Sequence, residues 1–200
     1  FFLYVGPREA DGRYPILSIS GFAEIVYWVW AEEAERPSLN LAGPFAGALA
    51  RESDNLVIRA ARALADACSV RKGVRLTLEK YLPVASGIGG GSADAAAALR
   101  ALNTLWDLRL SRDDLARIGA GLGSDIPACV YSRSRLMRGT GEETQPLSLP
   151  PLEAVLINPL EPVPTRDVYA QFDAQKGGAF FARAAAPDWR DAAAALAGLK

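Results

Sequence analysis

The sequence predicts an α+β fold, in which strands and helices follow one another irregularly instead of forming repeated strand–helix–strand units. Segments rich in β-branched and aromatic residues come first, amphipathic helical segments follow them, and short strand-like segments then return. Half of the 200 residues are hydrophobic, which is enough for the core of one large domain or of two small ones.

Strands are expected where β-branched and aromatic residues cluster or where apolar and polar residues alternate. The first two flank a turn that contains Asp11-Gly12. Residues 73–80 alternate, with Val74, Leu76 and Leu78 on one face, which is typical of a half-buried strand. The expected strands cover residues 1–5, 16–20, 24–31, 39–41, 73–80, 128–132, 136–138 and 154–157.

Helices are expected where apolar residues recur every three or four positions. One such segment, residues 92–106, directly follows a glycine-rich loop. Another begins at Ser111, a suitable N-cap with Asp114 at the third helical position. The expected helices cover residues 55–68, 92–106, 165–172 and 188–199, together with the helix that begins at Ser111.

The composition excludes several classes of function. The 22 basic and 23 acidic residues give a net charge of -1, which provides no overall field for nucleic acid or for an anionic membrane. Because the chain has no histidine, Ser-His-Asp and Cys-His catalysis and most zinc chemistry are excluded, and no metal-ligating residue is predicted. The two cysteines without a CxxC motif, and the lack of a signal peptide or an apolar span of roughly 20 residues, predict a cytoplasmic protein with reduced thiols.

The glycine-rich loop is the most informative segment. Residues 87–91 contain four glycines, which let the backbone approach a ligand closely and adopt positive φ. The following helix would direct its free N–H groups at the same loop, and Ser92 adds a hydroxyl suited to a phosphate oxygen or a magnesium ion. These features predict a phosphate cradle, and the alternative is a flexible turn without a ligand. The loop matches neither the Walker motif nor the dinucleotide fingerprint, since the required lysine and third glycine are missing.

Residues Pro83–Ala93 resemble the ATP loop of the GHMP kinases, the superfamily that includes galactokinase, homoserine kinase, mevalonate kinase and phosphomevalonate kinase. Further stretches, in family order, narrow the resemblance to the members that act in non-mevalonate isoprenoid biosynthesis. These stretches are Ala10–Gly12, Asp54–Ala60, Leu78–Lys80, Gly123–Pro127, and Asn158–Pro159 with Val163–Thr165. The resemblance implies a two-domain α+β GHMP kinase fold.

The implied activity is that of an ATP-dependent kinase. With Mg²⁺, it would transfer the γ-phosphoryl group of ATP to the 2-hydroxyl of 4-diphosphocytidyl-2-C-methyl-D-erythritol. This small molecule would be the partner, without nucleic acid or membrane. Two alternatives stay open: a GHMP kinase for a different alcohol, and a non-catalytic nucleotide-binding remnant.

The resemblance also assigns the ATP site and the catalytic residue. The implied ATP-binding residues are Pro83, Val84, Ala85, Ser86, Gly87, Ile88, Gly89, Gly90, Gly91, Ser92 and Ala93, with Asn55 and Lys80 in the adenine pocket. From the sequence alone, Asn55 equally suits a helix cap and Lys80 a solvated strand end. Asp125 matches the catalytic aspartate, which would orient or deprotonate the attacking hydroxyl, although its glycine and proline neighbours also suit a turn aspartate.

For the acceptor substrate, the resemblance implies Tyr169 as an aromatic residue that stacks on the cytosine base and Thr165 as a polar contact or a helix N-cap. The family's Asp-Gly-Tyr-His stretch reads Asp11–Pro15 here, with arginine and tyrosine in the last family positions. We therefore assign Tyr14 as the second stacking residue, in a shifted register, and note that Arg13 is suited to pair with a diphosphate.

The proline-rich break at residues 146–151 is a candidate domain boundary. We expect the N-terminal ATP-binding domain over residues 1–148 and the beginning of the C-terminal domain over residues 149–200. The family's Lys-x-Asn motif, whose lysine acts beside the aspartate, would align just before Phe1, and its last glycine-rich segment would follow Lys200. We therefore expect that both natural ends lie outside this sequence.

Overall fold

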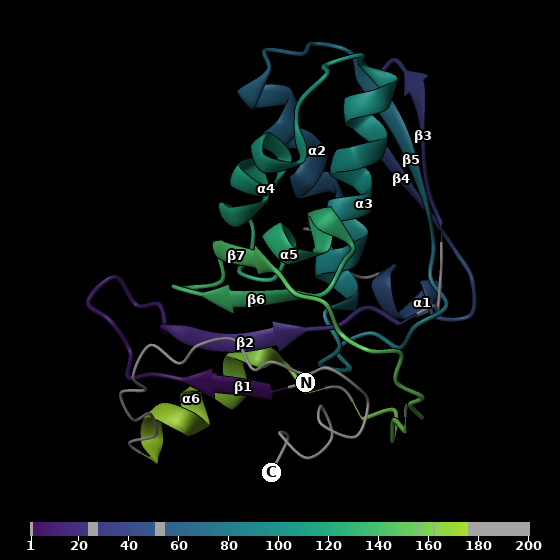
Figure 1. Cartoon of the computed structure of the whole chain (residues 1–200). Helices are drawn as coiled ribbons and strands as arrows, with labels where there is room; N and C mark the ends of the chain where they lie inside the picture. The colour runs from purple at the N-terminus through teal and green to yellow at the C-terminus, as the bar shows by residue number, and fades with distance from the viewer. Residues whose placement is uncertain (1, 24–27, 51–54, 156, 162, 176–200) are drawn as a thin grey trace.

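The computed structural model describes residues 2–23, 28–50, 55–155, 157–161 and 163–175. Over these residues the chain forms one four-stranded sheet, one three-stranded sheet and a set of helices, as the predicted α+β class requires. The three-stranded sheet lies along one side of the helices, and the four-stranded sheet lies across their lower end (Figure 1).

The four-stranded sheet is antiparallel throughout and joins segments from both ends of the described chain. Its strands, in spatial order, are β1 (Phe2–Val5), β2 (Ile16–Ser20), β6 (Arg135–Arg138) and β7 (Glu143–Pro146). Leu17, Ile19 and Leu136 from its central strands are buried and form a small core. The strands predicted over residues 1–5, 16–20 and 136–138 are thereby confirmed for the described residues, whereas β7 was missed.

The three-stranded sheet supplies the main core with its central strand. Its strands are β3 (Val29–Ala34), β4 (Ser38–Ala42) and β5 (Gly73–Glu79), and β5 pairs antiparallel with β3 and parallel with β4. As the alternation predicts, Val74, Leu76 and Leu78 are buried in the main hydrophobic core. The sheet therefore turns one face of β5 toward the helices.

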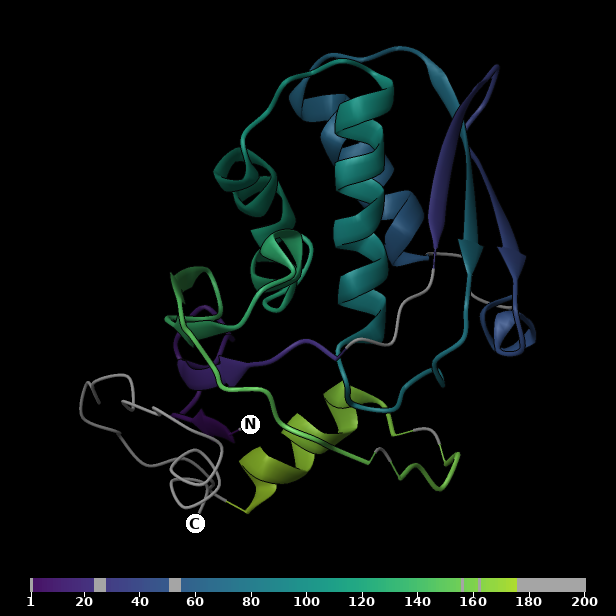
Figure 2. The same cartoon turned by 45° about the vertical axis from the view of Figure 1, so that its right-hand side comes forward.

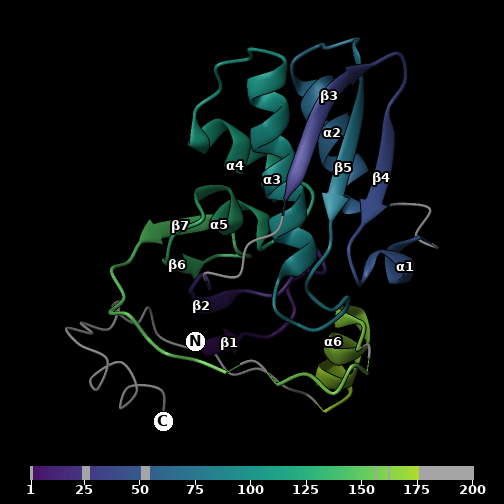
Figure 3. The ribbon, with the colours of Figure 1, turned by 90° about the vertical axis from the view of Figure 1, so that its right-hand side faces the viewer.

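The described residues form six helices, which are α1 (Ala46–Leu49), α2 (Leu56–Ala67), α3 (Gly90–Leu105), α4 (Arg112–Ala120), α5 (Ile126–Tyr131) and α6 (Thr165–Ala174). The central one is α3, which contacts α2, α4, α5 and β3, and its residues Ala95, Leu99 and Leu102 are fully buried. Figure 2 shows α3 upright between the sheet and the shorter helices α4 and α5. Figures 2 and 3 place α6 beyond the N-terminal end of α3, apart from the other helices.

Residues 128–132 were predicted as a strand, and this prediction was wrong because residues 128–131 belong to α5 and Ser132 is its C-cap. Pro127 lies in the first turn of α5, where its missing N–H costs no helical hydrogen bond. Ile126, Ala128 and Val130 are buried, so tertiary packing against α3 and α4 overrides the strand preference of the β-branched residues.

Other boundaries also differ from the predictions. The strand expected over residues 24–31 begins at Val29 and runs to Ala34, with residues 24–27 outside the described part. No strand forms at residues 154, 155 and 157, and the short helix α1 was missed. The helix expected from Ser92 begins two residues earlier, inside the glycine loop, and the helix expected over residues 188–199 lies outside the described residues.

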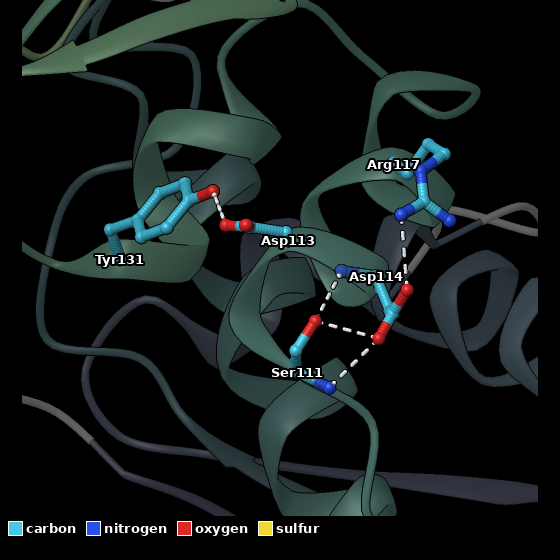
Figure 4. Close-up of polar contacts among 5 residues, drawn as sticks. All are labelled: Ser111, Asp113, Asp114, Arg117 and Tyr131. Atoms are coloured by element: carbon cyan, nitrogen blue, oxygen red, sulfur yellow. Dashed lines mark hydrogen bonds and ion pairs between the residues drawn. The ribbon is translucent and has the colours of Figure 1, made fainter.

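The predicted cap of α4 is confirmed in detail. The Ser111 hydroxyl accepts from the Asp114 N–H at 3.1 Å, and the Asp114 carboxylate accepts from the Ser111 N–H at 3.0 Å, which completes a capping box. Figure 4 shows this reciprocal pair together with Arg117, which forms an ion pair with Asp114, and with Tyr131, whose hydroxyl donates to Asp113. Two orphan N–H groups at the start of α4 are thus satisfied locally.

We predict that Ser111→Ala lowers the free energy of unfolding by about 1 kcal/mol, because the N-cap acceptor is lost while the fold is otherwise unchanged. Urea denaturation would measure the change. Arg117→Gln is the matched control, since it removes only an exposed ion pair to the same carboxylate and is expected to change stability less. An equal effect of the two variants would show that the capping box does not stabilise α4.

Candidate functional site

A cleft of about 1120 Å³ opens between the glycine loop, the start of α5 and helix α6. All the predicted site residues except Ala93 line it, although they come from segments far apart in the sequence. Ala93 packs against the main hydrophobic core instead. The fold therefore brings the predicted ATP, catalytic and substrate residues to one place.

The glycine loop has the backbone geometry of a phosphate cradle. Gly87 and Gly89 both have a φ of 72°, in the left-handed region that glycine adopts without strain. Gly89 is the N-cap of α3 and brings no side chain that could accept from the first N–H groups of the helix. The Ser86 hydroxyl donates to the carbonyl oxygen of Pro83 at 2.9 Å, which ties the loop to its own start.

Lys80 is buried and ion-paired, so the solvated strand end considered from the sequence is wrong. Its Nζ lies 2.6 Å from Oδ2 of Asp94, and the two side chains are 2% and 4% exposed. A Cβ added to Gly90 would lie 3.1 Å from this Nζ, so the ammonium sits against the first residue of α3. The pair joins the residue after β5 to a residue in the second turn of α3 across the glycine loop.

Asp94 was missed by the sequence analysis, although it lines the cleft beside Lys80. The only signal available was a carboxylate on the helix that follows a strand ending in lysine. Which face of α3 meets that lysine depends on how the helix packs against the three-stranded sheet, and a sequence pattern does not specify this.

Asn55 serves as the N-cap of α2, as one of its two sequence interpretations predicts. Its Oδ1 accepts from the Val57 N–H at 2.9 Å, and the residue is 8% exposed. Asn55 also lines the cleft, so the cap fixes the side chain at the site and leaves its amide group available for a further role there.

Asp125 occupies the N-cap position of α5, but its side chain accepts no capping hydrogen bond. Burial raises the pKa of its carboxyl. The loop between β6 and β7 supports this segment, since a Cβ added to Gly141 would lie 2.3 Å from the carbonyl oxygen of Ser124. Thr140, in the same loop, also lines the cleft and was not singled out from the sequence.

The predicted substrate residues gather around α6. The rings of Tyr14 and Tyr169 have centroids 4.5 Å apart with an interplanar angle of 43°, and the Tyr14 hydroxyl donates to Asp173 at 2.6 Å. Burial, followed by the charge of Asp125, raises the pKa of Tyr169, so this tyrosine lies within electrostatic range of the candidate catalytic carboxylate.

Two details of this region differ from expectation. Pro164 is the N-cap of α6, so Thr165 is its first helical residue and does not cap it. A base sandwiched between two rings needs about 7 Å between them, twice the stacking distance of about 3.5 Å, and Tyr14 and Tyr169 are closer than this. A base would therefore stack on an outer face of one ring, or the rings would separate to admit it.

Within the described ranges, no group of three or more His, Cys, Asp or Glu side chains is arranged to hold a metal ion. None of the helices in that part of the chain has both the length and the hydropathy of a membrane span.

Comparison with known proteins agrees with this geometry. The family model for the GHMP kinase N-terminal domain matches residues 55–133. The 4-diphosphocytidyl-2-C-methyl-D-erythritol kinase of Hyphomonas neptunium is 48% identical over 187 residues, which are 90% of this chain and 61% of that protein. The kinase of the same name from Bradyrhizobium diazoefficiens is 40% identical over 198 residues, which are 98% of this chain and 67% of that protein.

Solved structures give the same result. A 4-(cytidine 5'-diphospho)-2C-methyl-D-erythritol kinase superposes with a TM-score of 0.68 and 33% identity, covering 88% of this chain and 62% of that one. A homoserine kinase from Cytophaga hutchinsonii shares the fold, with a TM-score of 0.55 and 17% identity over 84% of this chain and 58% of that one.

The fold and its glycine loop thus place the molecule in the class of GHMP kinases. Within that class, the chain belongs to the family of the 4-diphosphocytidyl-2-C-methyl-D-erythritol kinases. It spans 52% to 67% of the length of the curated relatives that it matches.

We predict that Lys80→Met and Asp94→Leu each lower the free energy of unfolding by about 3–5 kcal/mol, because each leaves a buried charge without its partner. The double variant should lose much less, since two apolar side chains of suitable size can pack together. A urea-denaturation double-mutant cycle would measure this coupling. If the loss in the double variant equals the sum of the single losses, the pair does not act as a unit.

Proposed function

We propose that this chain carries the ATP-binding part of a kinase that phosphorylates the 2-hydroxyl of 4-diphosphocytidyl-2-C-methyl-D-erythritol. The names of the relatives supply the substrate, and the cleft supplies the site. The role that we propose for each residue follows from its position in that cleft.

One observation carries the nucleotide assignment. Gly91, at the second position of α3, has no positive φ, and a Cβ added to it would meet no protein atom within 4 Å. Glycine inside a helix makes the helix less stable than alanine does, by about 0.5–1 kcal/mol. Neither the backbone conformation nor the packing of the described residues therefore requires glycine at position 91. Close approach of a phosphate to the backbone explains why this position lacks a side chain.

In this proposal the glycine loop and the N-terminus of α3 bind the phosphates of ATP through backbone N–H groups. Asn55 and Lys80 form the adenine end of the cleft. Asp125 accepts the proton of the attacking hydroxyl, and burial supports this role because it brings the carboxyl pKa closer to neutral pH. The protein mainly positions the reactants and stabilises charge.

A magnesium ion fits the donors of the cleft. The Ser92 hydroxyl is an oxygen ligand of the kind that Mg²⁺ takes together with phosphate oxygens and water. When bound, Mg²⁺ neutralises charge on the phosphoryl group during transfer.

A second candidate function is phosphorylation of a different alcohol by the same chemistry. The departure at Arg13–Pro15 and the close contact of Tyr14 with Tyr169 support it, because both alter the place where the family's base would bind. A panel of alcohols that includes homoserine and mevalonate would separate the two candidates.

The complete gene product is expected to release ADP from ATP and Mg²⁺ only when 4-diphosphocytidyl-2-C-methyl-D-erythritol is added. Asp125→Asn should lower kcat by roughly 10²–10⁴-fold, since it removes the general base. Asp114→Asn, which alters a capping carboxylate outside the cleft, is the matched control and should retain activity. ATP binding without turnover on any alcohol would refute the kinase and leave a nucleotide-binding remnant.

Burial also makes a prediction about stability. Because the folded pKa of Asp125 lies above its unfolded value, the neutral carboxyl is favoured at low pH, and the stability it contributes is lost as pH rises through the folded pKa. Asp125→Asn keeps the shape without the charge. It should therefore gain stability relative to the native protein as the pH rises above the unfolded pKa of about 4 and through the folded pKa, as measured by urea denaturation. A relative loss over this range would contradict the assignment of burial as the cause.

A further inference from the structure

Few charged side chains line the cleft, and they differ in whether they already have an oppositely charged partner. Among the described residues they are the cations Arg13 and Lys80 and the carboxylates Asp94, Asp125 and Glu161. A kinase that transfers a phosphoryl group from ATP to a diphosphate-bearing alcohol must bind the negative charges of both molecules in this space. The positions of the cationic side chains therefore determine where the phosphate groups can bind.

The charge of Lys80 is already used. Its ammonium lies 2.6 Å from the Asp94 carboxylate, and both groups are almost fully buried. The pair is neutral overall and offers little attraction to an incoming phosphate.

Arg13 is placed differently. No described carboxylate lies within 4.0 Å of its guanidinium, which is exposed at the cleft. Its backbone is fixed in a turn: the Arg13 N–H donates to Asp11 at 2.9 Å, its carbonyl accepts from the Glu9 N–H at 2.8 Å, and Gly12 has a φ of 85°. The turn thus holds the backbone of Arg13 in place beside the cleft.

The position of Arg13 in the cleft separates it from the ATP end. It is next to Tyr14, whose ring contacts Tyr169 on α6, whereas Asn55, the N-cap of α2, and Lys80, the residue after β5, line the cleft from other segments. The pKa of Glu142 is lowered in spite of its burial, by hydrogen bonds from its own backbone and from Thr140 and by the charge of Arg13. Arg13 therefore lies within electrostatic range of Glu142, in the same loop as Thr140.

We propose that Arg13 binds the diphosphate of the alcohol substrate and is a specificity-determining residue for diphosphate-bearing acceptors. The inference rests on the proposed function and adds to it a residue that the family pattern does not supply. A guanidinium presents paired N–H donors that match phosphate oxygens, and a diphosphate beside Tyr14 is within its reach. The ATP phosphates are left to the backbone of the glycine loop.

The test compares Arg13→Gln, Arg13→Lys and Arg36→Gln in the complete gene product. Arg36 is the matched control, an exposed arginine in the turn between β3 and β4 that does not line the cleft. In Arg13→Gln, the KM for the alcohol should rise about tenfold or more, as expected for loss of charge-assisted hydrogen bonds. The KM for ATP should change less than about twofold. Arg13→Lys should recover part of the loss, because lysine keeps the charge without the paired donors.

A binding measurement keeps this inference separate from the kinase itself. Cytidine 5'-diphosphate is titrated by calorimetry with ADP present to occupy the glycine loop, and its affinity should fall about tenfold in Arg13→Gln but not in Arg36→Gln. If the native protein releases no ADP with any alcohol, the proposed function fails and this titration alone decides the role of Arg13. Equal affinities in the native protein and in Arg13→Gln, or a rise in KM for ATP alone, would overturn the inference.

Discussion

The buried ion pair between Lys80 and Asp94 fixes the geometry on which the cleft depends. It joins the end of β5 to the second turn of α3, so that the glycine loop between them is held at both ends. A buried pair of this kind contributes little net stability compared with apolar packing, but a carboxylate and an ammonium can satisfy each other in few arrangements. The placement of the start of α3 relative to the end of β5 is therefore specific, and the glycine loop connects these two fixed points.

The rest of the site is built outward from that fixed strand and helix. The β5 strand is the centre of its sheet and α3 the centre of the helices, so the loop between them is anchored in the main core on both sides. Asp125 reaches the same cleft from the start of α5, which packs on α3, and Gly141 lies so close to Ser124 that a side chain at residue 141 would clash with it. By contrast α6 has no buried residue, and its contact with the N-terminal part runs through the ring of Tyr14 and the carboxylate of Asp173.

The sequence predicted what local patterns determine. The alternation of apolar and polar residues predicted β5, and apolar residues at every third or fourth position predicted α2 and α3. Ser111 and Asp114 predicted the start of α4. Each of these signals depends on contacts within a few residues of the chain. It failed where tertiary contacts decide: residues 128–131 include Val130 and Tyr131, which favour a strand, but they pack as part of α5 against α3 and α4. The role of Asp94 could not be predicted for the same reason, because its partner Lys80 lies beside it only in the folded structure.

The charges in the cleft explain why the proposed reaction requires additional positive charge near the bound phosphates. Asp125 is buried, which raises the pKa of its carboxyl, and phosphates brought nearby would raise it further. A general base must nevertheless be ionised when the hydroxyl attacks, so positive charge is required close to the phosphates. Because Lys80 is paired with Asp94, the proposed function would take that charge from the N-terminal dipole of α3, from Arg13 and from a metal ion bound with ATP. In this proposal, backbone groups that do not titrate would hold ATP, and the side chain of Arg13 would select the acceptor.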